Sequence, residues 1–215
     1  MYTKYITILV LATLSVVDAA PAVVNKRETI TGSTSGTYDG YYFQNYVESG
    51  TGATLTLNSN SYTLGWDSAA EDVVAGIGWN PGAERDVTYS ATVDWNGDSL
   101  LALYGWTTNP LVEYYVIESY GTYNPGSAGT YKGSITSDGS TYVVRYDAPS
   151  IEGTSTFNQY LSIRQNQRTS GTITFSNHVQ GWADVGMDLG TWNLQIMATE
   201  GYESSGETIV TVQGL

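Results

Sequence analysis

The chain has 215 residues, with 8 Lys and Arg against 21 Asp and Glu and a formal net charge of −13. Such an acidic chain would repel a phosphate backbone, which argues against nucleic-acid binding. It has no Cys and one His, which excludes a disulfide framework, a thiolate metal site and cysteine catalysis and argues against a His-rich metal site. With 18 Tyr, 6 Trp and 24 Gly, the composition is typical of a folded all-β domain rather than a disordered acidic tail.

The N-terminus follows the pattern of a secretory signal peptide. Its apolar run, residues 6–17, is shorter than the roughly 20 residues that a membrane-spanning helix needs, so we expect no membrane anchor. The dibasic pair Lys26-Arg27 resembles the cut site of a eukaryotic secretory processing protease, and two surface charges are the alternative interpretation. We predict a signal peptide over 1–19, a short propeptide over 20–27 and a secreted, extracellular domain over 28–215.

Short segments of alternating apolar and polar residues follow, separated by Gly, Asn, Asp and Ser. Alternation gives each strand one apolar face and one face of Tyr, Trp, Thr and Gln. The clearest segments are 53–57, 87–93, 100–104, 112–117, 141–146 and 208–212. No linker or repeat interrupts the chain after Tyr38, so we predict one domain with a core of about 38–213. Two stacked, curved antiparallel sheets in a sandwich or β-jelly roll would bury the apolar faces and line a groove with the others.

One segment departs from the two-residue period. Apolar residues recur there at helical spacing, namely Val179, Trp182, Ala183 and Met187. Ser176 precedes them and is a residue type that often caps a helix. We predict one short helix over about 176–187, packed on a sheet. His178 lies inside it, so we interpret this His as a buried structural residue rather than the base of a Ser-His-Asp triad.

Two glutamates differ from the other acidic residues in their surroundings. Glu113 lies in a run of β-branched and aromatic residues, and Glu200 lies in the similar run 196–202. Tyr115 shares the face of Glu113 because side chains alternate along a strand. An ordinary surface position is the alternative for each glutamate. A pair of carboxyl groups is the chemistry that the composition leaves available, as in the cleavage of sugar polymers.

Several longer motifs carry a resemblance to a known family. They are YGWTTNPLVEYY (104–115), YGTYNP (120–125), PSIEGTSTFNQY (149–160), MATEGYESSG (197–206) and GWNPG (78–82). The chain is similar to the family 11 glycoside hydrolases, the small endo-β-1,4-xylanases of fungi and bacteria, over nearly all of its length from Tyr38. The resemblance implies a jelly roll shaped like a partly closed hand, with a thumb hairpin over about 142–157 that closes over a xylan-binding cleft.

The resemblance also implies a role for individual residues, without metal or cofactor. Glu113 matches the nucleophile and Glu200 the acid/base of a retaining double displacement. Asp72 matches the neighbour of the acid/base that is Asp in acidic members, which implies an acidic pH optimum. The matched substrate-binding residues are Tyr46, Tyr104, Tyr115, Arg145, Pro149 at the tip of the thumb, and Gln159. The expected partner is xylan, and the high negative charge favours a monomer.

Three positions depart from the family pattern. Tyr46 stands where most members have Trp, and Leu161 replaces a residue that is usually aromatic. The strand that enters the thumb, 142–146, is about four residues shorter, an even number that preserves alternation but can shift the pairing of the hairpin. This shortening supports an alternative, a non-catalytic carbohydrate-binding jelly roll with a defective thumb. Cleavage of β-1,4-glucan is a further alternative, against which a narrow cleft would exclude the extra CH₂OH of glucose.

Overall fold

The computed structural model describes residues 27–152 and 155–214, with the side chains at 148–152 and 155 left out. The predicted signal peptide, all but the last residue of the predicted propeptide, and residues 153–154 of the predicted thumb hairpin lie outside the described residues. In chain order the elements are β1 (Glu28–Ile30), β2 (Thr34–Tyr38), β3 (Tyr41–Val47), β4 (Ala53–Asn58), β5 (Ser61–Trp66), η1 (Ser68–Ala70), β6 (Asp72–Trp79), β7 (Asp86–Thr108), β8 (Val112–Tyr120), β9 (Thr130–Ser137), β10 (Ser140–Glu152), β11 (Ser155–Arg164), β12 (Ser170–Thr174), α1 (Phe175–Ala183) and β13 (Thr191–Gln213). No helix in this part of the chain is long and apolar enough to span a bilayer.

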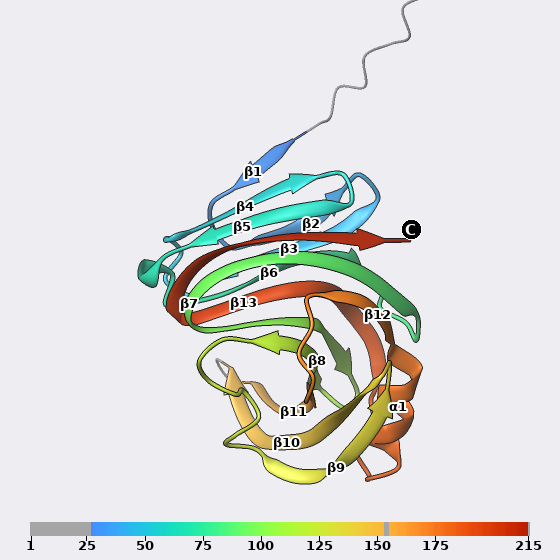
Figure 1. Ribbon diagram of the computed structural model, residues 1–215. Helices are drawn as coiled ribbons and strands as arrows, with labels where there is room; N and C mark the ends of the chain where they lie inside the picture. Colours follow the sequence, from blue (N-terminus) through green and yellow to red (C-terminus); the bar gives the residue numbers. More distant parts are fainter. Residues whose placement is uncertain (1–26, 153–154, 215) are drawn as a thin grey trace, which may run out of the picture.

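The strands form one hydrogen-bonded sheet of 13 strands that folds over into two layers (Figure 1). The long strands β7 and β13 pair with each other in both layers. The first part of β13 pairs with β6 in the inner layer, and its last part pairs with β5 in the outer layer. Figure 1 shows β8, β11, β10 and β9 curling away from this pair to extend the inner layer. The predicted all-β jelly roll is confirmed, and its two predicted sheets are two layers of one continuous sheet.

The sheet folds over where β7 and β13 pass from one layer to the other. The ladder between them is interrupted after Tyr202 and resumes at Ser204, so Glu203 forms a bulge with φ of 47°. Opposite it, Gly97 has φ of 104°, and a Cβ there would lie 2.8 Å from the carbonyl oxygen of Glu203. A bulge bends and twists a strand, and only Gly accepts both this φ and this close approach.

Alternation along the inner-layer strands separates a core face from an open face. On β8, Val112, Tyr114 and Val116 are buried in the core between the layers, as the pattern predicts. Glu113 and Tyr115 point to the opposite face. Each fully buried aliphatic or aromatic side chain contributes roughly 1.5–3 kcal/mol through the hydrophobic effect. A shift of one residue in register would reverse the two faces, so burial of the core fixes which side chains reach the open face.

The predicted helix is present as α1 and begins within one residue of its predicted start, but the predicted capping residue and the predicted C-terminal end are wrong. The residue before its first turn is Thr174 rather than Ser176, and no side chain caps it. The helix stops at Ala183 because Gly186 adopts a φ of 74°. The amide of Met187 then donates to a carbonyl of the last turn at 2.9 Å, which is the Schellman arrangement. Met187 is therefore buried just after the helix rather than in it.

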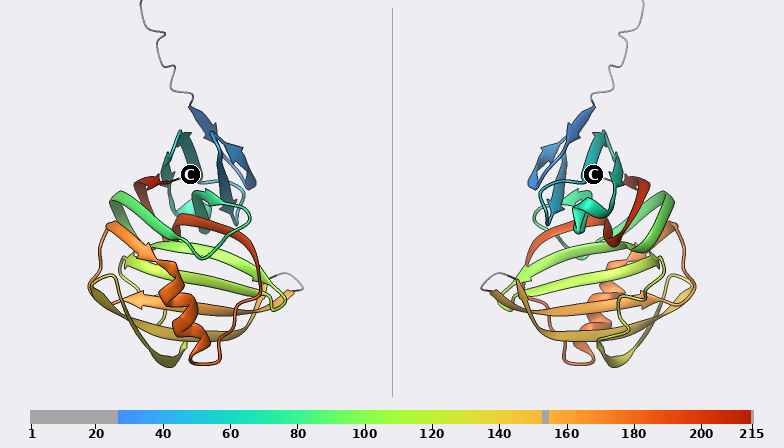
Figure 2. Two further views of the ribbon diagram at one scale, coloured as in Figure 1. Left: turned by 90° about the vertical axis from the view of Figure 1, so that its right-hand side faces the viewer. Right: turned by 90° about the vertical axis from the view of Figure 1, so that its left-hand side faces the viewer.

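Helix α1 covers the core face of the inner layer beside β9 to β11 (Figure 2). Its buried residues are Phe175, His178 and Trp182. The Phe175 ring stacks on Tyr114 with ring centroids 5.2 Å apart, and His178 meets Tyr142 edge to face at 4.6 Å. His178 is fully buried, as predicted. The helix thus closes the part of the core that the outer layer leaves open.

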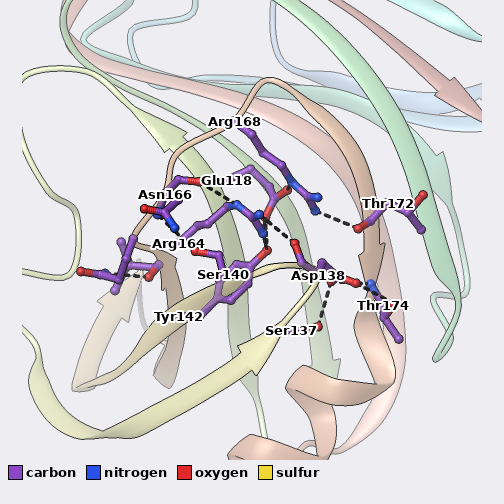
Figure 3. Close-up of polar contacts among 12 residues, drawn as sticks. Glu118, Ser137, Asp138, Ser140, Tyr142, Arg164, Asn166, Arg168, Thr172 and Thr174 are labelled. Carbon is purple, nitrogen blue, oxygen red and sulfur yellow. Dashed lines mark hydrogen bonds and ion pairs between the residues drawn. The ribbon is translucent and has the colours of Figure 1, made fainter.

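A buried carboxylate, Glu118, links several strands behind the open face (Figure 3). It accepts hydrogen bonds from the hydroxyls of Tyr89 (2.8 Å) and Tyr142 (2.5 Å) and from the guanidinium of Arg168. A second guanidinium, that of Arg164, lies 3.9 Å from its other oxygen. These contacts connect β7, β8, β10 and β11 with the segment that leads to β12.

The thumb hairpin is formed by β10 and β11. Its pairing runs from Tyr142 opposite Arg164 to Glu152 opposite Ser155, with one register shift between Asp147 and Ser150. The other edge of β10 pairs with β9 over Ser140 to Tyr146. The shortened strand, 142–146, is therefore paired on both sides. Its pairing with β11 is regular up to Asp147, and its pairing with β9 has a register shift between Val144 and Arg145.

Candidate active site

A cleft of about 1010 Å³ lies on the open face of the inner layer. Among the residues that line it are Gln44, Tyr46, Asp72, Tyr104, Trp106, Glu113, Tyr115, Phe157, Gln159 and Glu200. A smaller cavity of about 150 Å³ shares Tyr115, Gln159 and Glu200 with the cleft and extends toward Leu161 and Tyr202. Seven of the nine residues predicted for the site therefore lie together in this one cleft.

The register of the strands explains why these side chains meet. Across β7, β8 and β11, Trp106 pairs with Glu113 and Glu113 pairs with Gln159. On the other side, Tyr46 of β3 and Glu200 of β13 both pair with Val74 of β6, so the three residues lie in one row across the sheet. Directly paired residues of neighbouring strands point to the same face. Pairing thus places both glutamates on the cleft face from strands far apart in sequence.

Glu113 is surrounded by hydrogen-bond donors and is only 7% exposed. The hydroxyls of Tyr104 and Tyr115 donate to its Oε1 at 2.9 and 3.2 Å. The amide of Gln159 donates to its Oε2 at 2.7 Å. Hydrogen bonds of this kind stabilise the ionised form of a carboxyl group. Glu113 is therefore prepared to act as a carboxylate.

Glu200 has the opposite surroundings. It is partly buried, and its Oε2 has no hydrogen-bond partner among the described residues. Burial, the negative charge of Asp72 and that of Glu113 together hold the pKa of Glu200 well above its usual range, although the Tyr115 hydroxyl partly opposes them. Burial and neighbouring negative charges disfavour the ionised form. Glu200 is therefore prepared to hold a proton.

Asp72 lies at the start of β6 and lines the same cleft. It pairs with Tyr202, while Val74, two residues along β6, pairs with Glu200. Asp72 and Glu200 are thus diagonal neighbours on one face. After burial, the charge of Asp72 is the largest cause of the raised pKa of Glu200. The structure therefore brings Asp72 beside Glu200, the neighbour that the sequence resemblance implies.

Two predicted residues are not placed in the cleft. Arg145 pairs with Leu161 and lies on the cleft side of β10, but it lines neither cavity. Its guanidinium donates to the carbonyl of Gly129 at 3.1 Å and lies 5.6 Å from the ring of Tyr131. The 126–129 segment packs against the aliphatic part of the Arg145 side chain, which explains why the guanidinium reaches Gly129. The backbone of Pro149 belongs to β10, and its side chain lies outside the described residues.

Comparison with known proteins identifies the family of this chain. The family model described as glycosyl hydrolases family 11 matches residues 38–211. The chain belongs to glycosyl hydrolase family 11. The resemblance carried by the sequence motifs is thereby confirmed, and with it the class of the protein, a glycoside hydrolase.

Relatives of this family 11 chain match it over nearly its whole length. Endo-1,4-beta-xylanase 4 of Pyricularia oryzae is 47% identical, with 98% of this chain and 99% of the relative covered. Endo-1,4-beta-xylanase I of Cochliobolus carbonum is 46% identical, with 98% and 97% covered. A solved structure from a comparison of two major endo-1,4-beta-xylanases of Trichoderma reesei is 40% identical, with a TM-score of 0.74, and covers 84% of this chain and 100% of its own.

Several cleft residues of the family 11 chain were not singled out from the sequence. They include Gln44, Trp106 and Phe157. Each lies two residues from a predicted site residue on the same strand: Gln44 before Tyr46, Trp106 after Tyr104 and Phe157 before Gln159. Because alternate residues of a strand share a face, the two-residue period was a signal that could have identified them.

Metal binding was not expected from the sequence. Among the residues that the structure describes, no group of three or more His, Asp or Glu side chains is arranged to hold a metal ion. The cleft brings together the carboxyl groups of Glu113, Glu200 and Asp72 with hydroxyl and amide groups.

Proposed function

We propose that this chain is a secreted endo-1,4-β-xylanase that hydrolyses internal β-1,4-xylosidic bonds of xylan with retention of configuration. The observation that carries the proposal is the pair of carboxyl groups in one cleft with opposite surroundings. Glu113 receives three hydrogen bonds, and Glu200 has a raised pKa. Two carboxyl groups held in different protonation states are the arrangement that glycosidic bond cleavage requires.

In the first step, Glu200 donates its proton to the glycosidic oxygen of the leaving sugar. The carboxylate of Glu113 attacks the anomeric carbon from the opposite side, so that the glycosidic C–O bond breaks and an ester bond to Glu113 forms. The negative charge of Glu113 is lost on ester formation. One contribution to the raised pKa of Glu200 then disappears, which prepares Glu200 to accept a proton.

In the second step, Glu200 removes a proton from a water molecule, and the oxygen of that water attacks the anomeric carbon. The ester bond breaks, Glu113 leaves as a carboxylate and Glu200 is protonated again, so the enzyme returns to its starting state. Two inversions at one carbon restore the original configuration. No cofactor enters this balance.

The walls of the cleft fit a neutral sugar chain. The Tyr46 ring offers a flat surface for the apolar face of a sugar, while the hydroxyls and amides of Tyr104, Tyr115, Gln44 and Gln159 suit its hydroxyl groups. The names of the relatives, endo-1,4-beta-xylanases of two fungi, support xylan as the polymer. We propose xylan as the substrate and a monomer as the active form.

Secretion and processing belong to the same proposal. Strand β1 begins at Glu28, directly after the dibasic pair at which we propose cleavage, and pairs with β4. Cleavage after Arg27 would therefore leave every strand of the domain intact. The first residue of the secreted protein, read by N-terminal sequencing, tests this point, and any start beyond Glu28 would contradict it.

The alternative of a non-catalytic binding module has lost its main support. It depended on the shortened strand that enters the thumb. That strand remains paired with β11 and β9, and the thumb hairpin is paired up to Glu152. We therefore propose the enzyme alone.

Release of reducing sugar from xylan and from cellulose by the secreted protein tests the proposal. We expect xylo-oligosaccharides from xylan alone, and no release by Glu113→Gln. Glu207→Gln is a matched control, because this exposed glutamate lies further along the strand that carries Glu200. The anomer formed first, followed by NMR, should be the β anomer. Release from cellulose alone, an α product or retention on xylan without release would each overturn a stated part of the proposal.

A further inference from the structure

Trp106 lies on the cleft face of β7, directly opposite Glu113 on β8. It does not contact the carboxylate of Glu113 through a hydrogen bond of its own. Its indole Nε1 instead donates to the hydroxyl oxygen of Tyr104 at 2.5 Å. An indole N–H is a donor only, so in this contact the oxygen of Tyr104 must be the acceptor.

The direction of the Tyr104 hydroxyl proton follows from this contact. A hydroxyl group has one proton to donate, and its oxygen lies 2.9 Å from Oε1 of Glu113, which in its ionised form can only accept. The proton of a phenol lies near the ring plane and has two favourable directions. The N–H of Trp106 excludes a proton pointing at itself, which leaves the direction toward Glu113. Acceptance from Trp106 also polarises the hydroxyl and makes it a stronger donor.

We propose that Trp106 is a positioning residue for the nucleophile: its Nε1–H orients the Tyr104 hydroxyl so that the proton of Tyr104 points at Glu113. This inference rests on the proposed function, because it assigns to Glu113 the role of nucleophile. Trp106 acts through Tyr104 and need not touch the reacting atoms.

Burial strengthens the relay of hydrogen bonds that runs from Trp106 through Tyr104 to Glu113. Tyr104 is 4% exposed, so its hydroxyl competes little with solvent for these two contacts. Burial and the charge of Glu113 hold the pKa of Tyr104 well above its usual range, and the hydrogen bond from Trp106 acts in the opposite direction by stabilising negative charge on the oxygen. At working pH, Tyr104 therefore keeps the proton that it donates.

Trp106 has a second contact that must be separated from the first. Its ring lies 4.9 Å from that of Phe157, in a tilted arrangement. Phe157 is two residues before Gln159 on β11, and Gln159 is another donor to Glu113. Replacement of Trp106 can thus affect the nucleophile through its N–H or through ring packing. Loss of the N–H and loss of ring packing predict different results for Trp106→Phe and Phe157→Leu.

An aryl xylobioside with an acidic phenol as its leaving group isolates the attack by Glu113, because such a phenol leaves without a proton from Glu200. Trp106→Phe keeps a ring against Phe157 and removes the N–H. We expect kcat/KM on this substrate to fall about tenfold, the size of one lost hydrogen bond to a charged network, with little change in KM. We also expect the acidic limb of the pH profile, where the carboxylate form is lost, to move to higher pH.

A double-mutant cycle with Tyr104→Phe decides between the two effects. In the Tyr104→Phe protein the relay has no middle group, so Trp106→Phe should reduce kcat/KM by less than about twofold. A full tenfold loss in that background would overturn the proposal, because Trp106 would then act through packing or through the sugar itself. Phe157→Leu changes the ring packing and the wall of the cleft but keeps the N–H of Trp106, and we expect it to lower activity without moving the acidic limb.

The indole N–H resonance of Trp106 gives a second test that requires no active or stable Trp106 variant. In the wild type it should lie downfield, and it should shift upfield in Tyr104→Phe, with Glu207→Gln as the unshifted control. No shift in Tyr104→Phe would overturn the relay. A wild type without activity on xylan and on the aryl xylobioside would overturn the proposed function instead, and the resonance would still decide the contact between Trp106 and Tyr104.

Discussion

Glu113 and Glu118 lie on the same strand, β8, and each accepts hydrogen bonds from two tyrosine hydroxyls. They differ in the remaining partners. The carboxylate of Glu118 is fully buried and faces the guanidinium groups of Arg164 and Arg168 (Figure 3). Glu113 has a neutral amide as its third donor and a second carboxyl group in the same cleft. Glu118 thus lies beside two cations, whereas Glu113 lies in a cleft with a second glutamate.

The difference shows how one strand can serve stability and chemistry at once. Removal of one partner from a buried ion pair leaves an uncompensated buried charge. A carboxylate beside another carboxyl group has a protonation state that its neighbour can change. Glu118 therefore connects the strands behind the cleft. Glu113 and Glu200 lie in one cleft, where the charge of one can change the protonation state of the other, as catalysis requires.

The largest expected effect is that of Glu113→Gln on activity. We expect kcat/KM to fall on the order of 10⁴-fold or more, because an amide does not replace the carboxylate as nucleophile. The free energy of unfolding should change by only about 1 kcal/mol, since the Gln side chain keeps the size of Glu and its carbonyl oxygen can still accept from the two tyrosine hydroxyls. Activity on xylan and unfolding in urea measure the two effects. A variant within tenfold of the wild-type rate would remove Glu113 from the mechanism.

Glu118→Gln should give the opposite result. We expect a loss of about 3–5 kcal/mol in the free energy of unfolding, because the buried guanidinium of Arg164 and the partly buried one of Arg168 lose their carboxylate. Activity per folded molecule should stay near that of the wild type. In a cycle with Arg168→Gln, the double variant should be more stable than the sum of the single losses predicts. Strictly additive losses would show that the two groups do not interact.

His178 provides a test of how burial in the core acts on a titratable group. Burial, with smaller contributions from Arg164 and Arg168, lowers the pKa of His178 from 6.5 to about 4, and Asp138 opposes them. The unfolded chain therefore binds this proton at a higher pH than the folded chain does. Stability is present above about pH 6.5 and is lost as the pH falls toward 4, by up to about 3 kcal/mol in total.

Unfolding in urea at pH 7 and at pH 4 measures this dependence. The wild type should lose more stability between the two values than His178→Leu, whose side chain does not titrate. Comparing the pH difference of each protein removes the constant cost of repacking. An equal loss in both proteins would assign the acid sensitivity to the carboxyl groups and not to His178.

The smallest expected effect is that of Asp72→Asn on the pH profile. We propose that the active form holds a proton on Asp72 as well as on Glu200, so activity in the wild type falls when Asp72 loses its proton and before Glu200 ionises. In Asp72→Asn the limit becomes the ionisation of Glu200 itself, whose pKa burial and Glu113 still raise. We expect the basic limb of kcat/KM to move upward by about one pH unit. Asp94→Asn, a strand carboxylate outside the cleft, is the control, and an unchanged profile in Asp72→Asn would contradict the role.

Much of the fold could be predicted because its signals are local. Alternation along each strand identified the all-β class and placed Glu113 and Tyr115 on one face, since a two-residue period depends only on the extended backbone. The helix was found from its spacing, but its end was not. That end depends on the positive φ of Gly186, and a Gly in sequence does not tell which of its allowed conformations it adopts.

The direction of the Arg145 side chain could not be predicted from a local pattern in the same way. Register alone places it on the cleft side of β10, as expected. Its guanidinium is held by the carbonyl of Gly129, a contact between segments that no local pattern describes. A long side chain reaches several partners from one backbone position, so its direction is decided by what packs around it.

The two glutamates of β8 show what could not be predicted from the sequence alone. The sequence determined the strands, the two faces of each strand and, through family motifs, the residues of the cleft. The neighbours of Glu113 in sequence pointed to a functional face, but they do not tell which charges meet Glu113 or, five residues further along the strand, Glu118. Only the tertiary structure brings Arg164 and Arg168 to one and Glu200 to the other, because the pairing of distant strands decides which charges lie within interaction distance.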